Sequence, residues 1–177
     1  MLTEQDIYLF REGTHYRSYE KLGAHPTAAG AAAEQGTEFA VWAPNAAYVS
    51  VVGDFNGWNP QSNPLEARAD SSGLWAGFLR GVRPGALYKY HIVSKNQGYT
   101  VNKSDPFAFR CEVPPRTASV VWDLSYEWGD QEWMQTRARK NALDAPQSVY
   151  ELHVGSWRRI PGRSCWLPDA LITESRS

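Results

Sequence analysis

The chain has 177 residues and a mass of 19.9 kDa, enough for one domain and part of a second. Its formal net charge is −1 and it has no run of Lys or Arg, so nucleic acid and anionic membranes are not expected as partners. Two cysteines are too few for a disulfide framework, and neither a signal peptide nor a membrane span is recognisable, so we expect a cytoplasmic protein.

Aromatic residues are abundant, whereas catalytic motifs are scarce. The aromatic fraction of 13%, with eight tryptophans, is typical of dense sheet packing or of surfaces for flat, partly apolar ligands such as sugars. The four histidines have no metal-ligand spacing, and no phosphate-binding glycine loop or nucleophile motif occurs. No two carboxylates stand as a paired acid and base. We therefore expect no metal, no cofactor and no catalysis.

Residues 1–36 are expected to form an N-terminal extension and a loop. Residues 6–19 mix apolar and charged side chains and predict a short helical turn that packs on the following domain. Residues 22–36 are interpreted as a loop because Gly23, Pro26 and Gly30 interrupt them.

Residues 37–125 alternate short strands with turns and show no helical period. In the clearest strand, Tyr88 and Tyr90 share one face, while Lys89 and His91 lie on the other. This pattern predicts an all-β fold, an immunoglobulin-like antiparallel β-sandwich. The expected strands are residues 37–42, 48–52, 63–69, 74–79, 87–93, 99–102 and 118–122.

A loop tryptophan, Trp58, follows the second of these strands among glycines and asparagines that favour a defined turn. Its ring either folds back on the core as a lid or is offered to a ligand. The strand face with Lys89 and His91, bordered by the loops that carry Trp58 and Tyr99, would suit a sugar.

The C-terminal third of the chain is expected to leave the sandwich. Residues 126–147 are interpreted as a linker with a helix at 131–140, and 148–159 as a strand covered on both faces, which opens a second domain. An unpaired strand at 149–154 predicts docking on the sandwich or self-association. Residues 160–177 show no period, and we expect a poorly ordered tail.

Several long motifs are also familiar. The segments FAVWAPNAAYVSVVGDFNGWN, YKYHI, KSDPFAF and SVYELHVGSWRR resemble the N-terminal half of bacterial 1,4-α-glucan (glycogen) branching enzymes. The resemblance implies that the sandwich is a family 48 carbohydrate-binding module. It also implies that residues 148–159 are the first strand of a glycoside hydrolase family 13 (β/α)₈ barrel. The partner implied is an α-glucan oligosaccharide or polysaccharide.

The same resemblance implies the binding residues. The glycan-binding tryptophan falls on Trp58 and the binding lysine on Lys89, with Tyr99 as the second aromatic and later polar contacts at Thr117 and Ser119. In the family, the catalytic Asp, Glu and Asp lie further along the barrel. The residues after 159 are unfamiliar here, so we expect a chain without its catalytic barrel.

Three functional hypotheses remain open on the sequence. The first is a non-catalytic α-glucan-binding module. The second is a structural interface domain that packs on a branching-enzyme barrel and binds no sugar. The third, a transferase or hydrolase, predicts turnover of amylose by the purified chain.

Overall fold

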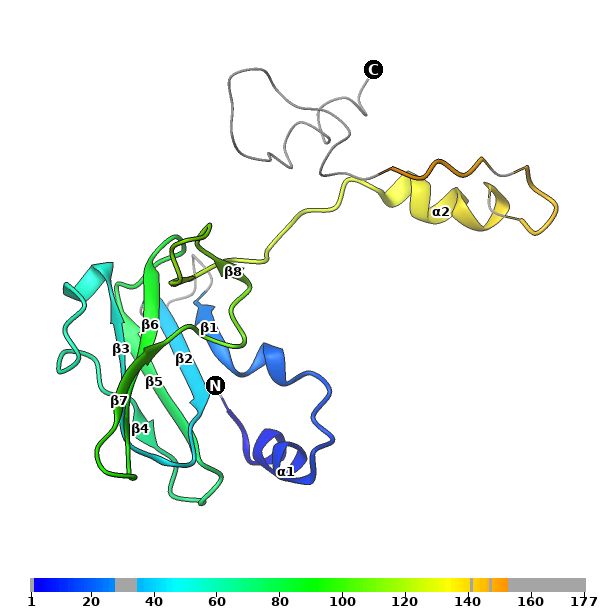
Figure 1. The fold of residues 1–177 in the computed structure, drawn as a ribbon. Helices are drawn as coiled ribbons and strands as arrows, with labels where there is room; N and C mark the ends of the chain where they lie inside the picture. Colours follow the sequence, from blue (N-terminus) through cyan, green and yellow to red (C-terminus); the bar gives the residue numbers. More distant parts are fainter. Residues whose placement is uncertain (1, 28–34, 141, 147, 153–177) are drawn as a thin grey trace, which may run out of the picture. The chain divides into compact units, whose positions relative to one another are not determined.

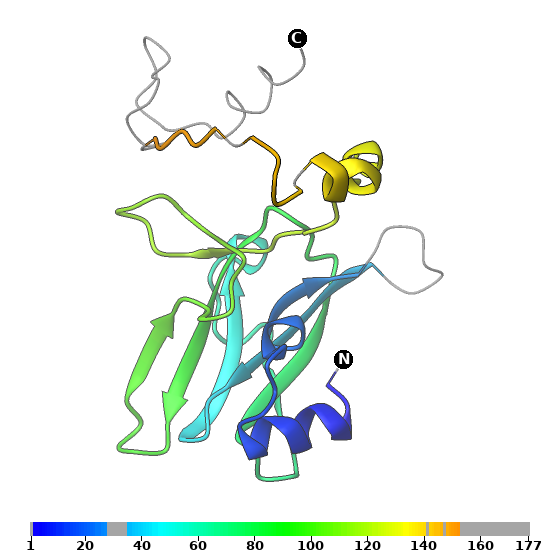
Figure 2. The same ribbon diagram turned by 90° about the vertical axis from the view of Figure 1, so that its right-hand side faces the viewer.

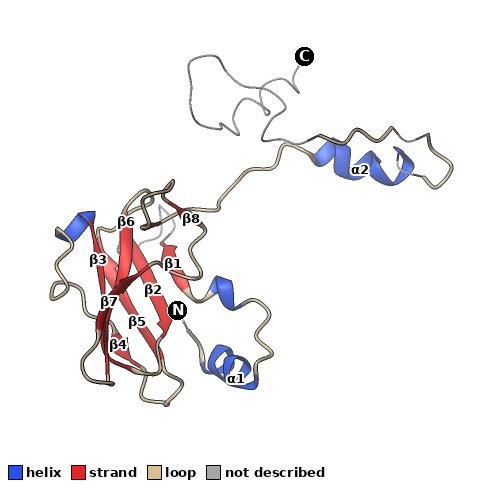
Figure 3. Cartoon of the chain, viewed as in Figure 1, coloured by secondary structure: helices blue, strands red, loops and turns tan. Residues whose placement is uncertain are grey.

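The computed structural model describes residues 2–27, 35–140, 142–146 and 148–152. The chain divides into two units, Met1–Tyr126 and Glu127–Ser177, and each is described by itself. The first unit carries two antiparallel sheets packed as layers (Figures 1 and 2). The strands account for most of its regular structure (Figure 3), which confirms the all-β sandwich that the alternating pattern predicts.

In the described part of the chain, nine strands make up the two sheets, and each of their pairings is antiparallel. The first sheet has the order β1 (Gly23–Pro26), β2 (Gly36–Trp42), β5 (Leu74–Arg80), β4 (Glu66–Ala67). The second sheet has the order β3 (Ala46–Gly53), β6 (Leu87–Ser94), β9 (Ser119–Val120), β8 (Arg110–Cys111), with β7 (Thr100–Lys103) also paired to β6.

The core lies between the sheets because alternate side chains of the long strands point inward. Phe39 of the first sheet meets Tyr88 of the second edge to face, with 5.1 Å between ring centroids, and Tyr88 lies 5.9 Å from Tyr90 in the same geometry. Val49 and Val51 of β3 are also fully buried. Lys89 and His91 consequently lie on the outer face of the second sheet, as their positions in the strand predict.

Strand β1 corrects the expectation of a loop at residues 22–36. Residues Gly23–Pro26 pair with β2, and Ala24, opposite Phe39, is buried in the core. Proline is tolerated here because β1 is an edge strand and Pro26 is its last residue. Glycine suits position 23, where φ is +102° and a Cβ atom would lie 3.1 Å from the Phe107 carbonyl oxygen. Residues 28–34 lie outside the described part of the chain.

Helix α1 (Glu4–Glu12) and the 3₁₀ turn η1 (Ser18–Glu20) form the N-terminal extension, in agreement with the predicted helical turn. Thr3 and Asp6 form a capping box: the Thr3 hydroxyl oxygen accepts a hydrogen bond from the Asp6 backbone N–H, and the Asp6 carboxylate accepts one from the Thr3 N–H. Ile7 packs in a second apolar cluster with Leu22 and with Leu74 of β5. The helix thus covers part of the outer face of the first sheet.

The second unit contains helix α2 (Gln131–Lys140), where a helix is predicted, with three basic residues in its last turn. Residues 148–152 form no strand, and the rest of the strand predicted at 148–159 lies outside the described residues, as does 160–177. Self-association through 149–154 therefore stays a prediction. No helix in the described ranges is long and apolar enough to cross a membrane.

Candidate functional site

The loop that carries Trp58 begins with the 3₁₀ turn η2 (Asp54–Asn56), directly after β3. The Asn56 side chain fixes it: its Nδ2 donates to the Val51 carbonyl at 2.9 Å and to Asn63 Oδ1 at 2.7 Å, and its Oδ1 accepts from the Gly53 N–H at 3.0 Å. The Asn56 side chain thus forms hydrogen bonds with backbone groups at the end of β3 and so holds the turn in place. The turn prediction for this stretch is confirmed in detail.

Trp58 has an unusual backbone conformation. Its φ is +62°, a left-handed value that is rare for a bulky side chain, and its N–H donates to the Gly53 carbonyl at 2.8 Å. The residue is 41% exposed, so the indole is not sealed in the core. Strain of this kind persists where the surrounding structure enforces it, and it is concentrated at functional sites.

Lys89 and Thr117 lie at the same end of the second sheet as this loop. Lys89 of β6 stands opposite Val52 of β3, and its Nζ donates to the Thr117 hydroxyl at 2.7 Å. The Leu87 N–H donates to the Asp54 carboxylate at 3.2 Å, which ties the Trp58 loop to the start of β6. Three of the predicted site residues are thus brought to one end of the sheet.

Tyr99 lies at the other end of β6. The Tyr99 carbonyl accepts from the Ser94 N–H at 2.8 Å in the connection to β7, and the side chain is 66% exposed. Lys89 and Ser94 are five residues apart, about 17 Å along an extended strand. Figures 1 and 2 show the β6–β7 connection at the end of the sheet opposite to η2. The structure therefore does not place Tyr99 beside Trp58.

Ser119 is buried beneath the same surface. Its exposure is 0%, and its Oγ accepts a hydrogen bond of 2.9 Å from the Asp105 N–H. A fully buried hydroxyl cannot touch a ligand on the surface, so Ser119 is left out of the proposed binding residues. Its role in the fold is to hold Asp105.

Asp105, between β7 and β8, forms a buried polar centre that sequence analysis did not identify. Its Oδ2 accepts from the Tyr88 hydroxyl at 2.5 Å and from the Tyr90 hydroxyl at 3.4 Å, and its Oδ1 accepts from the Phe107 N–H at 2.8 Å. Burial raises the pKa of the Asp105 carboxyl, and these hydrogen bonds offset part of the rise. Burial, together with the Asp105 charge, also raises the pKa of both tyrosines.

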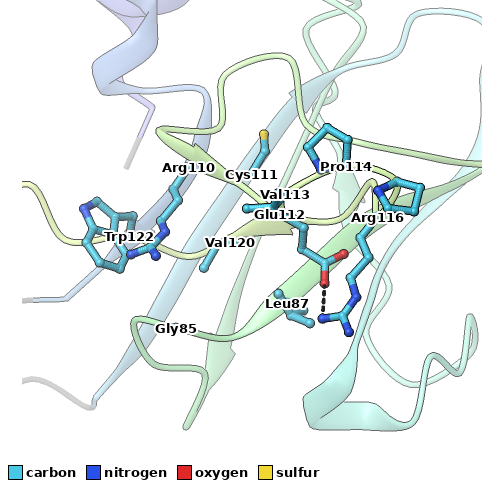
Figure 4. A pocket seen from close by; sticks show the side chains of 11 residues that line it. Gly85, Leu87, Arg110, Cys111, Glu112, Val113, Pro114, Arg116, Val120 and Trp122 are labelled. Atoms are coloured by element: carbon cyan, nitrogen blue, oxygen red, sulfur yellow. Dashed lines mark ion pairs between the residues drawn. The ribbon is translucent and has the colours of Figure 1, made fainter. Parts of the chain in front are cut away.

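A groove of about 490 Å³ borders the start of β6 (Figure 4). The Arg110 guanidinium lies 4.0 Å from the centroid of the Trp122 ring, and Arg116 Nη1 lies 3.8 Å from Glu112 Oε1. Sequence analysis missed this groove, because its residues come from three separate stretches of the chain, 85–87, 110–116 and 120–122. Within the described ranges no cluster of three or more His, Cys, Asp or Glu side chains could hold a metal ion.

Gly53 is required at the junction between β3 and the Trp58 loop. An added Cβ would lie 2.2 Å from the Leu87 carbonyl oxygen and 2.4 Å from Cε1 of Phe55. We expect Gly53→Ala to lower the free energy of unfolding by about 1–2 kcal/mol, because β6 or the Trp58 loop must move to make room for the methyl group. Urea denaturation measures the change. The matched control is Gly129→Ala, whose added methyl meets nothing within 4 Å. Equal stability of the two variants would contradict this close packing.

A family model described as carbohydrate-binding module 48 (isoamylase N-terminal domain) matches residues 21–108. The match begins just before β1 and includes Trp58, Lys89 and Tyr99. Thr117 and most of the groove lie beyond it.

Close sequence relatives cover nearly the whole chain. The 1,4-alpha-glucan branching enzyme GlgB of Albidiferax ferrireducens is 54% identical over 162 residues, which are 92% of this chain and 25% of the relative. The enzyme of the same name from Aquifex aeolicus is 53% identical over 161 residues, 91% of this chain and 25% of the relative. The chain thus spans about a quarter of the length of these relatives.

Among solved structures, a Klebsiella pneumoniae pullulanase complexed with maltotriose aligns with 58% of this chain and 9% of its own. The TM-score is 0.45 and the sequence identity 26%. A likeness at this level supports no conclusion about function.

Proposed function

Because residues 21–108 belong to carbohydrate-binding module family 48, we propose that the sandwich is a non-catalytic module of a glycogen branching enzyme that binds α-1,4-glucans. The ligands of this class are glycogen, starch and maltooligosaccharides. The proposed binding surface is the outer face of the second sheet at the start of β6, and the residues proposed to contact the ligand are Trp58, Lys89 and Thr117. Tyr99 would contact only a ligand that extends along β6.

The observation that supports the proposal is an exposed tryptophan on a fixed loop at the same end of the second sheet as an amine and a hydroxyl. The apolar face of a glucose ring stacks on an indole, and the sugar hydroxyls accept hydrogen bonds from an ammonium group and exchange them with a threonine. Because the loop is already ordered by Asn56, binding costs little conformational entropy there.

The expected affinity is modest. Half-covering one indole removes on the order of 100 Å² from water, which contributes roughly 2.5 kcal/mol at ~25 cal/mol/Å². The free energy lost when the ligand and the protein give up translational and rotational freedom offsets part of this gain and of the gain from hydrogen bonds. A single site should therefore have a Kd near the millimolar scale. Many repeats along a polymer raise the effective affinity, so glycogen should bind more tightly than a short oligosaccharide.

We expect Trp58→Ala to weaken maltoheptaose binding by about tenfold or more, because the stacking surface is lost. Lys89→Ala should weaken maltoheptaose binding by a smaller factor, because an exposed hydrogen bond donated by the lysine contributes less than the stacking surface of the indole. Isothermal titration calorimetry with the purified chain measures both, and tryptophan fluorescence follows the wild type independently.

Tyr16→Ala is the matched control, since Tyr16 is 87% exposed in the N-terminal extension and should leave the Kd unchanged. Circular dichroism checks that each variant keeps its fold. A wild type that gives neither heat nor a fluorescence change would contradict the proposal, and so would equal binding by Trp58→Ala.

A structural interface domain is the second candidate, supported by apolar side chains on the other sheet. Trp42 of β2 is 54% exposed and Phe78 of β5 is 41% exposed. Such side chains on an outer face suit contact with another protein surface. This candidate would replace the first if a separately produced barrel domain of the enzyme bound the chain while maltoheptaose did not.

A further inference from the structure

The groove shares a strand face with Lys89. Leu87 and Lys89 point to the same side of β6, two residues and about 7 Å apart. Leu87 pairs with Val120, and both line the groove. The groove floor is therefore continuous with the surface that carries the lysine.

The groove and the Trp58 loop lie on opposite sides of β6. The loop follows β3, whereas the groove lies over β9 and β8, and the strand order is β3, β6, β9, β8. Neighbouring strands are about 4.8 Å apart, so the path from β3 to β8 crosses the sheet over roughly 14 Å. Figure 1 shows η2, the start of β6 and β8 at the same end of the sandwich. Tyr99, at the far end of β6, is off this path.

The side chains of the groove suit a neutral ligand rich in hydroxyl groups. Trp122 is 37% exposed and offers apolar ring surface, and Arg110 holds the ring from one side. Glu112 supplies a carboxylate acceptor and Arg116 a guanidinium donor, and Figure 4 shows the two side chains paired with each other. Glu112 is held in place because its Oε2 accepts from the Ala118 N–H at 3.1 Å. The volume of about 490 Å³ is within the ordinary range of about 300–1,000 Å³ for small-molecule sites.

We infer that this groove is a second subsite for the same α-glucan, with Trp122 as its aromatic contact, so that one saccharide chain runs across the strands from Trp58 over Lys89 into the groove. The inference rests on the proposed function, because it extends the proposed surface. It assigns the second ring of the site to Trp122 rather than Tyr99.

Nuclear magnetic resonance of the ¹⁵N-labelled full chain tests this directly through the indole N–H signals. The signals of Trp58, Trp122 and Trp42 are assigned with single Trp→Phe variants. We expect maltoheptaose to shift the signals of both Trp58 and Trp122, whereas maltose, which is too short to cross the sheet, shifts only that of Trp58. The Trp42 signal should stay in place, because Trp42 belongs to β2 of the other sheet and its Nε1 donates to the Ser72 carbonyl rather than to a group at the start of β6.

The outcomes separate the two proposals. If maltoheptaose shifts the Trp58 signal and leaves Trp122 unmoved, the groove subsite is wrong and the proposed function stands. If neither signal moves, the proposed function fails and the subsite with it. A shift of Trp122 without Trp58 would also contradict a continuous path.

A variant provides a second measurement. Trp122→Phe should weaken maltoheptaose binding by about threefold to tenfold while changing maltose binding by less than twofold. Tyr99→Phe is the control and should change neither. An equal loss for both ligands would overturn the subsite, because it would indicate a general disturbance of the fold.

Discussion

Replacing Asp105 with Ala is expected to lower the free energy of unfolding by about 2–4 kcal/mol, the largest effect expected for any single change proposed for this protein. The substitution removes the acceptor of the buried Tyr88 hydroxyl and of the Phe107 N–H. The Tyr90 hydroxyl keeps carbonyl oxygens of Gly23 and Ala40 within 3.4 Å, so it loses less. Urea denaturation followed by circular dichroism measures the change.

A double-mutant cycle isolates the central contact. Asp105→Asn and Tyr88→Phe, alone and together, should show a coupling energy of about 1 kcal/mol or more, because the two side chains share one buried hydrogen bond. Asp123→Ala is the control, since that carboxylate is exposed and accepts its hydrogen bonds from the nearby Ser125. Strict additivity, or a loss no larger than that of the control, would contradict the buried network.

The contribution of Asp105 to the stability of the fold decreases as pH rises. Burial raises its folded pKa above the ordinary value of 3.8, so the folded state binds the proton more tightly than the unfolded chain does. The stability contributed by this group is therefore full below about pH 4 and is lost as pH rises through the folded pKa. Asp105→Asn should flatten the stability curve in that window.

Asp6→Ala is expected to lower the free energy of unfolding by about 2–3 kcal/mol, the second largest effect. The carboxylate caps α1 through Thr3, lies 3.1 Å from His15 Nε2 and 3.2 Å from Lys21 Nζ, and is only 8% exposed. Loss of the cap contributes about 1 kcal/mol, and loss of the His15 hydrogen bond and of the Lys21 ion pair contributes the rest, reduced because Lys21 is partly exposed. Hydrogen exchange should show faster exchange in residues 4–22 while β6 stays protected.

Acid should imitate the Asp6→Ala variant. Burial opposes ionisation of Asp6, but hydrogen bonds from Thr3, His15 and Lys21 prevail and lower its pKa well below 3.8. Its contribution is thus present above the unfolded value and is lost as pH falls below about 4 towards the folded pKa. Wild-type exchange in residues 4–22 that is insensitive to pH in this range, after correction for intrinsic rates, would contradict the assignment.

Local sequence patterns were sufficient for most of the sandwich. Tyr88, Lys89, Tyr90 and His91 alternate between faces, and the structure places them accordingly. The turn residues around Trp58 predict an ordered loop, which Asn56 provides. In both cases the deciding interactions are between neighbours in the chain, so the sequence contains the necessary information.

The features that sequence analysis missed depend on long-range contacts. Strand β1 contains a glycine and a proline and is recognisable only through its partner β2. Nothing local in the sequence distinguishes Ser119 from a surface serine; the fold buries it, and its Oγ accepts a hydrogen bond from the Asp105 N–H. Trp122, at an outward position after β9, was the one residue of the groove that the sequence could have pointed to. Arg110, which stacks on its ring, lies twelve residues earlier in β8, and sequence analysis does not show that the two side chains meet.

The placement of α1 separates the two outer surfaces of the sandwich. The N-terminal arm is clamped to the first sheet through Ile7 and its apolar neighbours, whereas the outer side of β6 belongs to the second sheet. A saccharide on the second sheet and a protein on the first sheet would therefore bind different surfaces. The proposed sugar contacts and the exposed apolar side chains of the first sheet thus lie on separate faces, so each role can be tested by substitutions that leave the other face unchanged.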